Sequence, residues 1–114
     1  MPRVEEFERC YVGITTRDQA KIHFFNGVEL EPIEPLRIYS CDIGWSYGAQ
    51  KSNTGLSILT DYFERVEKPN ATKAMAQAFT DQFISTLREN DVLFIEEFRI
   101  EDWPRVMRML GEAA

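Results

Sequence analysis

Residues 20–30 read Ala-Lys-Ile-His-Phe-Phe-Asn-Gly-Val-Glu-Leu and carry the strongest structural signal in the chain. Every second residue from Ala20 to Phe24 is apolar, which is the period of a β-strand with one buried face. The pair Asn26-Gly27 follows at once, and both residue types accept the positive φ angles of a two-residue type I′ turn. The stretch therefore predicts a β-hairpin that turns at this pair.

Two further runs extend the hairpin into a sheet. Residues 9–16 alternate, with Cys10, Val12 and Ile14 on one face of a half-buried strand. Two prolines after the hairpin remove backbone donors and interrupt the ladder. Residues 36–40 then alternate again, which predicts another strand. The first part of the chain is thus expected to form an antiparallel β-meander of three to five strands.

The second half of the chain carries helical periodicity instead. Apolar residues recur every three or four positions in residues 56–66 and again in residues 75–87. Asn70 suits the N-cap of the second helix, and a last short helix is expected to open at residues 101–102. Residues 92–99 fit either a strand or the entry to a helix. The order predicts an α+β fold, with two longer helices and a short C-terminal helix on one face of the sheet.

Length and charge limit what this chain can be. Its 114 residues suffice for one domain, and we expect a flexible arm at residues 1–8 and a single domain at residues 9–114. The formal net charge is -6, so direct binding to nucleic acid or to an anionic membrane is not expected. No apolar run is long enough for a membrane span or a secretion signal, which points to the cytoplasm.

The stretch from Asp42 to Gly55 reads as a glycine-containing loop with a heavy aromatic load. Trp45 and Tyr47 are its aromatic residues, and two interpretations of them stay open. Either the rings plug the open end of the sheet, or they present a recognition surface, because aromatic and arginine side chains dominate binding hot spots. The residues expected on that surface are Arg37, Asp42, Trp45, Tyr47 and Lys51.

Residues suited to catalysis or metal binding are sparse. The single histidine, His23, has no partner at a motif spacing, and Cys10 and Cys41 are too far apart for a C-x-x-C pair. We therefore expect no catalytic residue, no metal and no cofactor. Four carboxylates form either a solvated face or a negative field that steers a basic partner. They are Glu96, Glu97, Glu101 and Asp102.

The central part of the sequence resembles a known family. The residues that carry the resemblance are Tyr11-Val12-Gly13, Gly27, Arg37, the run Ser-Cys-Asp-Ile-Gly-Trp-Ser-Tyr-Gly at 40–48, and residues 56–62. They are similar to an uncharacterised phage- and plasmid-encoded domain family, which has a Ser-x-Asp-x-x-Trp-x-Tyr-Gly-like motif and no assigned activity. Cys41 stands where that family has proline, and residues 50–53 replace its glycine-rich turn.

The resemblance implies a gene carried by a phage or another mobile element. Such elements carry small acidic proteins that act by binding, and some block host defence complexes of the CRISPR type by occupying basic channels. We therefore expect a non-enzymatic interaction protein whose partner is a protein or ribonucleoprotein complex of the bacterial host. The alternative is a domain that binds a small ligand or nucleotide, as an enzyme or otherwise, with its site in the aromatic loop at residues 42–53.

Overall fold

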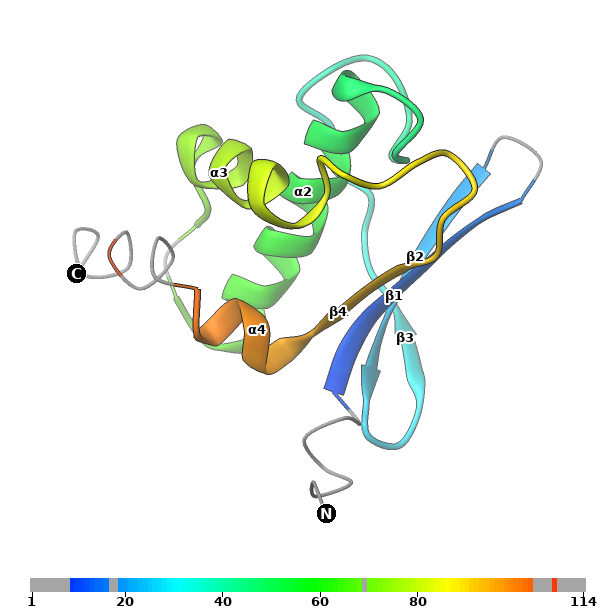
Figure 1. Ribbon diagram of the computed structural model, residues 1–114. Coiled ribbons are helices and arrows are strands. Elements are labelled where there is room, and N and C mark those ends of the chain that lie inside the picture. Colours follow the sequence, from blue (N-terminus) through cyan, green and yellow to red (C-terminus); the bar gives the residue numbers. More distant parts are fainter. Residues whose placement is uncertain (1–8, 17–18, 69, 104–107, 109–114) are drawn as a thin grey trace.

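The computed structural model describes residues 9–16, 19–68, 70–103 and 108. Four strands form one antiparallel sheet in the order β3-β2-β1-β4, so the strand that comes last in the sequence lies beside the first (Figure 1). The arm expected at residues 1–8 lies outside the described residues. The strands span Arg9–Thr16 (β1), Gln19–Asn26 (β2), Leu30–Pro32 (β3) and Leu93–Glu96 (β4).

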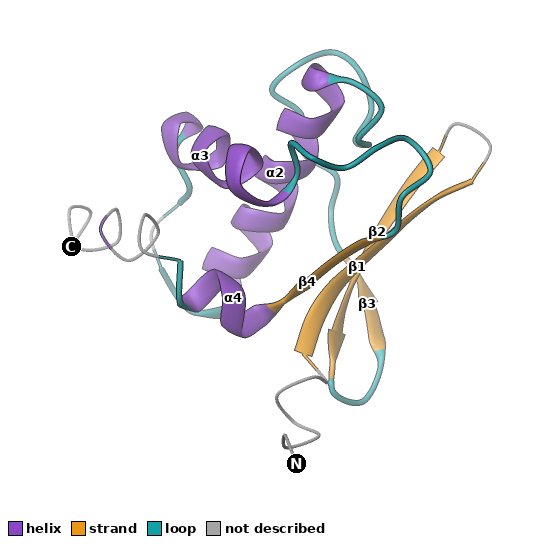
Figure 2. Cartoon of the chain, viewed as in Figure 1, coloured by secondary structure: helices purple, strands orange, loops and turns teal. Residues whose placement is uncertain are grey.

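The three helices of the described residues lie on one side of this sheet, and none of them covers its other face (Figure 2). They are α2 (Gly48–Arg65), α3 (Lys73–Phe83) and α4 (Glu97–Glu101). The predicted α+β fold is therefore confirmed, with an antiparallel sheet, two longer helices and a short one. None of the described helices is long and apolar enough to cross a bilayer.

The core lies between the inner face of the sheet and the helices. Tyr11, Phe24 and Ile95 are neighbours across three strands, and all three side chains are buried. The Tyr11 hydroxyl donates a hydrogen bond of 2.7 Å to the carboxylate of Asp61, which joins the sheet to α2. β1 thus turns its Tyr11 face toward the helices. The helices contribute Ile58, Leu59, Phe63 and Phe79 to the same core, and Ile84, the C-cap of α3, joins them.

The hairpin is present, but its turn lies one residue later than expected. The Asn26 amide donates to the Glu29 carbonyl at 3.2 Å, so Gly27 and Val28 are the two central residues. Gly27 has a φ of 98°, as glycine tolerates, whereas Asn26 stays in the strand. The Asn26 side chain explains the shift, because its Oδ1 accepts the amides of Val28 and Glu29 at 2.8 and 3.0 Å.

Two predictions between the hairpin and the helices are wrong. Residues 48–55, expected to be loop, are the first half of α2. The second of the two glycines in this stretch, Gly55, lies where α2 meets α3, and a side chain there would collide with Thr80. Residues 36–40 form no strand, because the amides of Leu36, Ile38 and Tyr39 bind side chains of α2 rather than a neighbouring strand.

Boundaries in the second half also differ from those expected. Thr72 rather than Asn70 caps α3, and its side chain accepts the Met75 amide at 3.1 Å. α3 ends at Phe83, before the predicted end. Residues 92–99 hold a strand and then a helix, because α4 follows β4 directly. α4 ends at Glu101, and the short helix predicted to open at residues 101–102 continues past Trp103 into a part of the chain that lies mostly outside the described residues.

Candidate functional site

The β3–α2 loop, residues 33–47, is irregular backbone that the fully buried side chain of Asn53 holds in place. Asn53 Oδ1 accepts the amides of Ile38 and Tyr39 at 2.7 and 3.0 Å. Its Nδ2 donates to the carbonyls of Tyr39 and Cys41 at 3.3 and 2.8 Å. One side chain on α2 thus satisfies both donors and acceptors of the loop, as a neighbouring strand would do elsewhere.

Two hydroxyl side chains of α2 fix the loop on either side of this contact. Ser57 Oγ accepts the Leu36 amide at 2.7 Å. Thr54 Oγ1 accepts the Gly44 amide at 2.8 Å and donates to the Gly44 carbonyl at 2.6 Å. Every buried side-chain nitrogen or oxygen among the described residues has a hydrogen-bond partner. These hydrogen bonds hold the loop in one conformation. The loop therefore loses less conformational entropy when a partner binds.

Trp45 belongs to the core. Its side chain is 0% exposed, and its indole Nε1 donates a hydrogen bond of 2.9 Å to the Asp91 carbonyl. Gly13 on β1 makes room for the ring, because a Cβ at that position would lie 2.9 Å from it. Trp45 therefore fits the interpretation in which the ring plugs the end of the sheet. In the folded chain, no partner can contact this buried ring.

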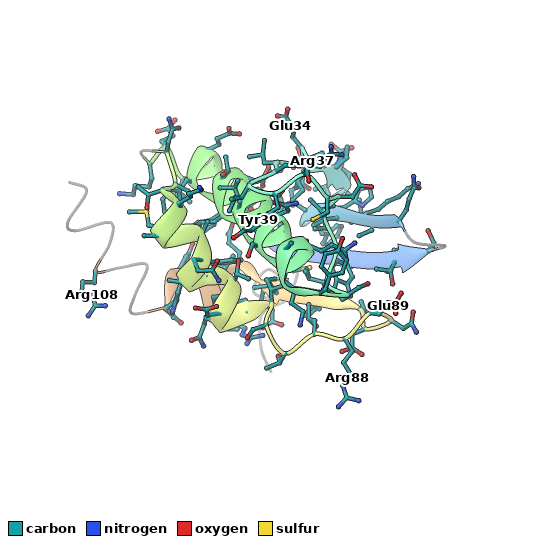
Figure 3. All side chains as sticks on the ribbon, turned by 90° about the horizontal axis from the view of Figure 1, so that it is seen from above. Glu34, Arg37, Tyr39, Arg88, Glu89 and Arg108 are labelled. Carbon is teal, nitrogen blue, oxygen red and sulfur yellow. The ribbon has the colours of Figure 1, made fainter. Side chains whose placement is uncertain are left out.

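The other residues expected around the loop are exposed or partly exposed. Tyr47 is 51% exposed, and so is a residue that the sequence did not single out, Tyr39, at 50%. Arg37 forms an ion pair with Asp42, and both side chains are exposed. Figure 3 shows Arg37 and Tyr39 on the same side of the molecule. We call this set the loop face, and it consists of Arg37, Tyr39, Asp42, Tyr47 and Lys51.

Individual contacts position members of the loop face. A hydrogen bond with Cys41 raises the pKa of Tyr47. Tyr39 and Lys51 line the same groove, which has a volume of about 390 Å³. Lys51 is itself positioned by a bond of 2.8 Å from its Nζ to the Ser85 carbonyl.

A cavity of about 410 Å³ lies beside the loop, at the end of the sheet. Ile43, Gly44 and Tyr47 form its wall on the loop, and Thr15 and Glu89 line it as well. The Thr15 hydroxyl donates to the Glu89 carbonyl at 2.8 Å, which ties β1 to the segment before β4. A cavity of this size is sufficient for a small molecule.

The four predicted carboxylates do not form one field. Arg9 binds Glu97 with two hydrogen bonds of 2.8 and 3.0 Å, and Glu96 lies 3.8 Å from Arg99 Nε. Glu101 and Asp102 remain exposed. Partial desolvation of its carboxylate raises the pKa of Glu101, and the neighbouring carboxylates of Glu97 and Asp102 add to this effect. Of these four carboxylates, Glu101 and Asp102 take part in no ion pair between described residues.

The carboxylates and the loop face are also far apart. α4 lies near the C-terminal end of α2, whereas the loop wraps the N-terminal half of that helix (Figure 1). The structure thus divides the predicted binding residues into two separate groups. Among the described residues, no three His, Cys, Asp or Glu side chains lie close enough together to hold a metal ion.

Sequence reasoning missed the residues that hold the loop. Asn53, Thr54 and Ser57 lie on the buried side of α2, directly beside the apolar residues Ile58 and Leu59. A run of small polar residues that continues an apolar helical stripe is the signal that could have identified them. Such a run indicates a helix that binds irregular backbone, because buried polar groups need hydrogen-bond partners.

Comparisons with known proteins find no relative of this chain. A scan against protein-family models finds no match, and searches of the curated proteins and of the solved structures find none either. The resemblance to the phage and plasmid family therefore rests on the sequence motif alone.

Proposed function

We propose that this chain is a non-enzymatic interaction protein of phage or mobile-element origin that acts in the cytoplasm of the bacterial host. Its partner is a protein or ribonucleoprotein complex of that host, with a CRISPR-type defence complex as the class that the resemblance implies. The observation that carries this proposal is the pair of half-exposed tyrosines, Tyr39 and Tyr47, on a loop that buried side chains already fix.

Two features of the loop face support binding to a macromolecule. Tyrosine offers a large amphipathic contact surface at a low cost in side-chain entropy, and Arg37 adds a residue type that is enriched at binding hot spots. The four hydrogen bonds of Asn53 hold the backbone under Tyr39 before any partner arrives. A surface with these two properties loses little conformational freedom when it binds.

The exposed carboxylates supply the second part of the proposal. Glu101 and Asp102 lie away from the loop face and carry negative charge into solvent. In a chain with a net charge of -6, they steer a basic partner during approach without forming the main contact. Rim charges act mostly on association rate, so Glu101→Gln with Asp102→Asn should slow association at low salt and have little effect above about 0.15 M salt.

Capture from a host lysate tests the proposal. The wild-type chain should retain a stoichiometric protein or ribonucleoprotein complex, and the double variant Tyr39→Ala/Tyr47→Ala should lose it while keeping its circular dichroism spectrum. Phe98→Ala is the matched control, because Phe98 is 43% exposed on α4 and lies outside the loop face. Equal capture by the double variant and the wild type would reject the loop face.

The cavity of about 410 Å³ favours a second candidate function, the binding of a small ligand or nucleotide. Tyr47 lines this cavity, so ligand binding and partner binding predict different results for the same variants. If this second function holds, at least one nucleotide in a thermal-shift screen should raise the melting temperature of the chain. Tyr47→Ala should then reduce the shift, and Tyr39→Ala, which lies outside the cavity, should not.

A further inference from the structure

The outer face of the sheet is turned away from the described helices (Figures 1 and 2). Strand alternation and register place Val12, Ile14, Phe25, Leu30 and Phe94 on it, from all four strands. Phe94 is 48% exposed, and Ile14 and Leu30 are exposed to a similar degree. Contiguous exposed apolar side chains of this kind mark an interaction surface.

This face is electrically balanced, unlike the chain as a whole. Among the described strand residues that point to it, Lys21 and Glu96 carry the formal charges, and Glu96 also pairs with Arg99 of α4, so this face has no net negative charge against -6 for the chain. Like charge keeps the remaining acidic surfaces of two copies apart. The outer face is therefore the region where two copies of this chain approach each other without repulsion.

The two charges are placed symmetrically about Val12. Lys21 pairs with Ile14, two residues after Val12, and lies one strand away on β2. Glu96 pairs with Cys10, two residues before Val12, and lies one strand away in the opposite direction on β4. With ordinary strand spacings, each charge is about 8 Å from Val12, on opposite sides of it.

We propose that the outer face binds a second copy of this chain in a two-fold symmetric dimer whose axis passes close to Val12. An axis in the plane of the interface, perpendicular to the line from Lys21 to Glu96, brings each lysine opposite the glutamate of the other copy. This pairing forms twice, as a two-fold interface requires. The apolar side chains between the two pairs are then buried against each other, with the sheets crossing steeply as in orthogonal sheet packing.

Two further observations agree with this arrangement. The edge strands β3 and β4 have only three and four residues, which disfavours addition of a partner strand at an edge and leaves the face for contact. The separation of 3.8 Å between Glu96 and Arg99 Nε is too long for a hydrogen bond. The Glu96 carboxylate therefore keeps acceptor capacity for a lysine from the second copy.

Sedimentation equilibrium of the full chain tests the dimer. The wild type should be dimeric, and Phe94→Glu should weaken dimerisation by about 100-fold or more, because it places two carboxylates in a dry interface. Phe98→Glu is the matched control, since Phe98 has a similar exposed fraction of 43% but lies on α4, and it should dimerise like the wild type. A monomeric wild type, or a Phe94→Glu variant that dimerises normally, would overturn the proposal.

A charge exchange tests the register of the two copies. Lys21→Glu and Glu96→Lys should each weaken self-association by about tenfold, because each variant places like charges opposite one another. In an equimolar mixture of the two variants, both facing pairs are again of opposite sign, so the mixed dimer should recover most of the wild-type affinity. With both variants folded by circular dichroism, a mixture that dimerises no better than either variant alone contradicts the two-fold arrangement.

Discussion

Asn53→Ala should destabilise the chain far more than a substitution of one polar residue usually does. The buried amide makes four hydrogen bonds to loop backbone, two as acceptor from Ile38 and Tyr39 and two as donor to the carbonyls of Tyr39 and Cys41. Each net hydrogen bond contributes about 1 kcal/mol. Some of the freed loop groups turn to water, so we expect a loss of about 2–4 kcal/mol in the free energy of unfolding.

Urea unfolding followed by circular dichroism measures this loss. The loop should also open locally, so the amides of Ile38 and Tyr39 should exchange with solvent much faster than in the wild type. Asn70→Ala is the control, because Asn70 is an exposed asparagine and its replacement should change stability by less than about 0.5 kcal/mol. If Asn53→Ala behaved like the control and the two loop amides stayed protected, Asn53 would not be what holds the loop.

Three further perturbations test the fold. Gly55→Ala should lower the free energy of unfolding by about 1–3 kcal/mol, because a Cβ at this position would collide with the Thr80 hydroxyl. A Cβ at Gly48 meets nothing within 4 Å, so Gly48→Ala should be neutral. Equal melting curves for the two variants would contradict the close approach of α2 and α3. Gly27→Val should cost about 1 kcal/mol or more at its φ of 98°, and an unchanged melting temperature would argue against the turn. Burial raises the pKa of Tyr62 to about 12, above the value near 10 of an unfolded tyrosine, so stability should fall as the pH rises from 10 toward 12. Tyr62→Phe should make that decline shallower, and an identical pH profile would contradict the burial of a neutral phenol.

The parts of the fold that the sequence predicted are those that depend on local periodicity. The alternation in β1 and β2 and the apolar stripe of α2 and α3 each repeat with the period of their own element, so neighbours in sequence carry the signal. Gly27 was expected to need a positive φ, and it has one. The side chain of Asn26 moved the turn by a residue, and turn residues alone do not reveal that competition.

The parts that the sequence did not predict depend on contacts between distant segments. Asn53 and Thr54 resemble loop residues because small polar side chains are uncommon inside a helix, and only the position of residues 38–44 gives them partners. The same holds for the site. Trp45 is buried and Tyr47 is exposed because Gly13 and the Asp91 carbonyl accommodate the indole, and both lie far from the loop in sequence.

The central claim is that the preorganised loop face binds the partner complex. Calorimetric titration of that complex, once it has been captured and purified, is the most direct test. The wild-type chain should saturate the complex at a fixed stoichiometry. Tyr39→Ala/Tyr47→Ala should bind about 100-fold more weakly, because truncation of two hot-spot aromatic side chains removes most of their contact area. Phe98→Ala should titrate like the wild type. Equal affinities for the wild type and the tyrosine double variant would contradict the account.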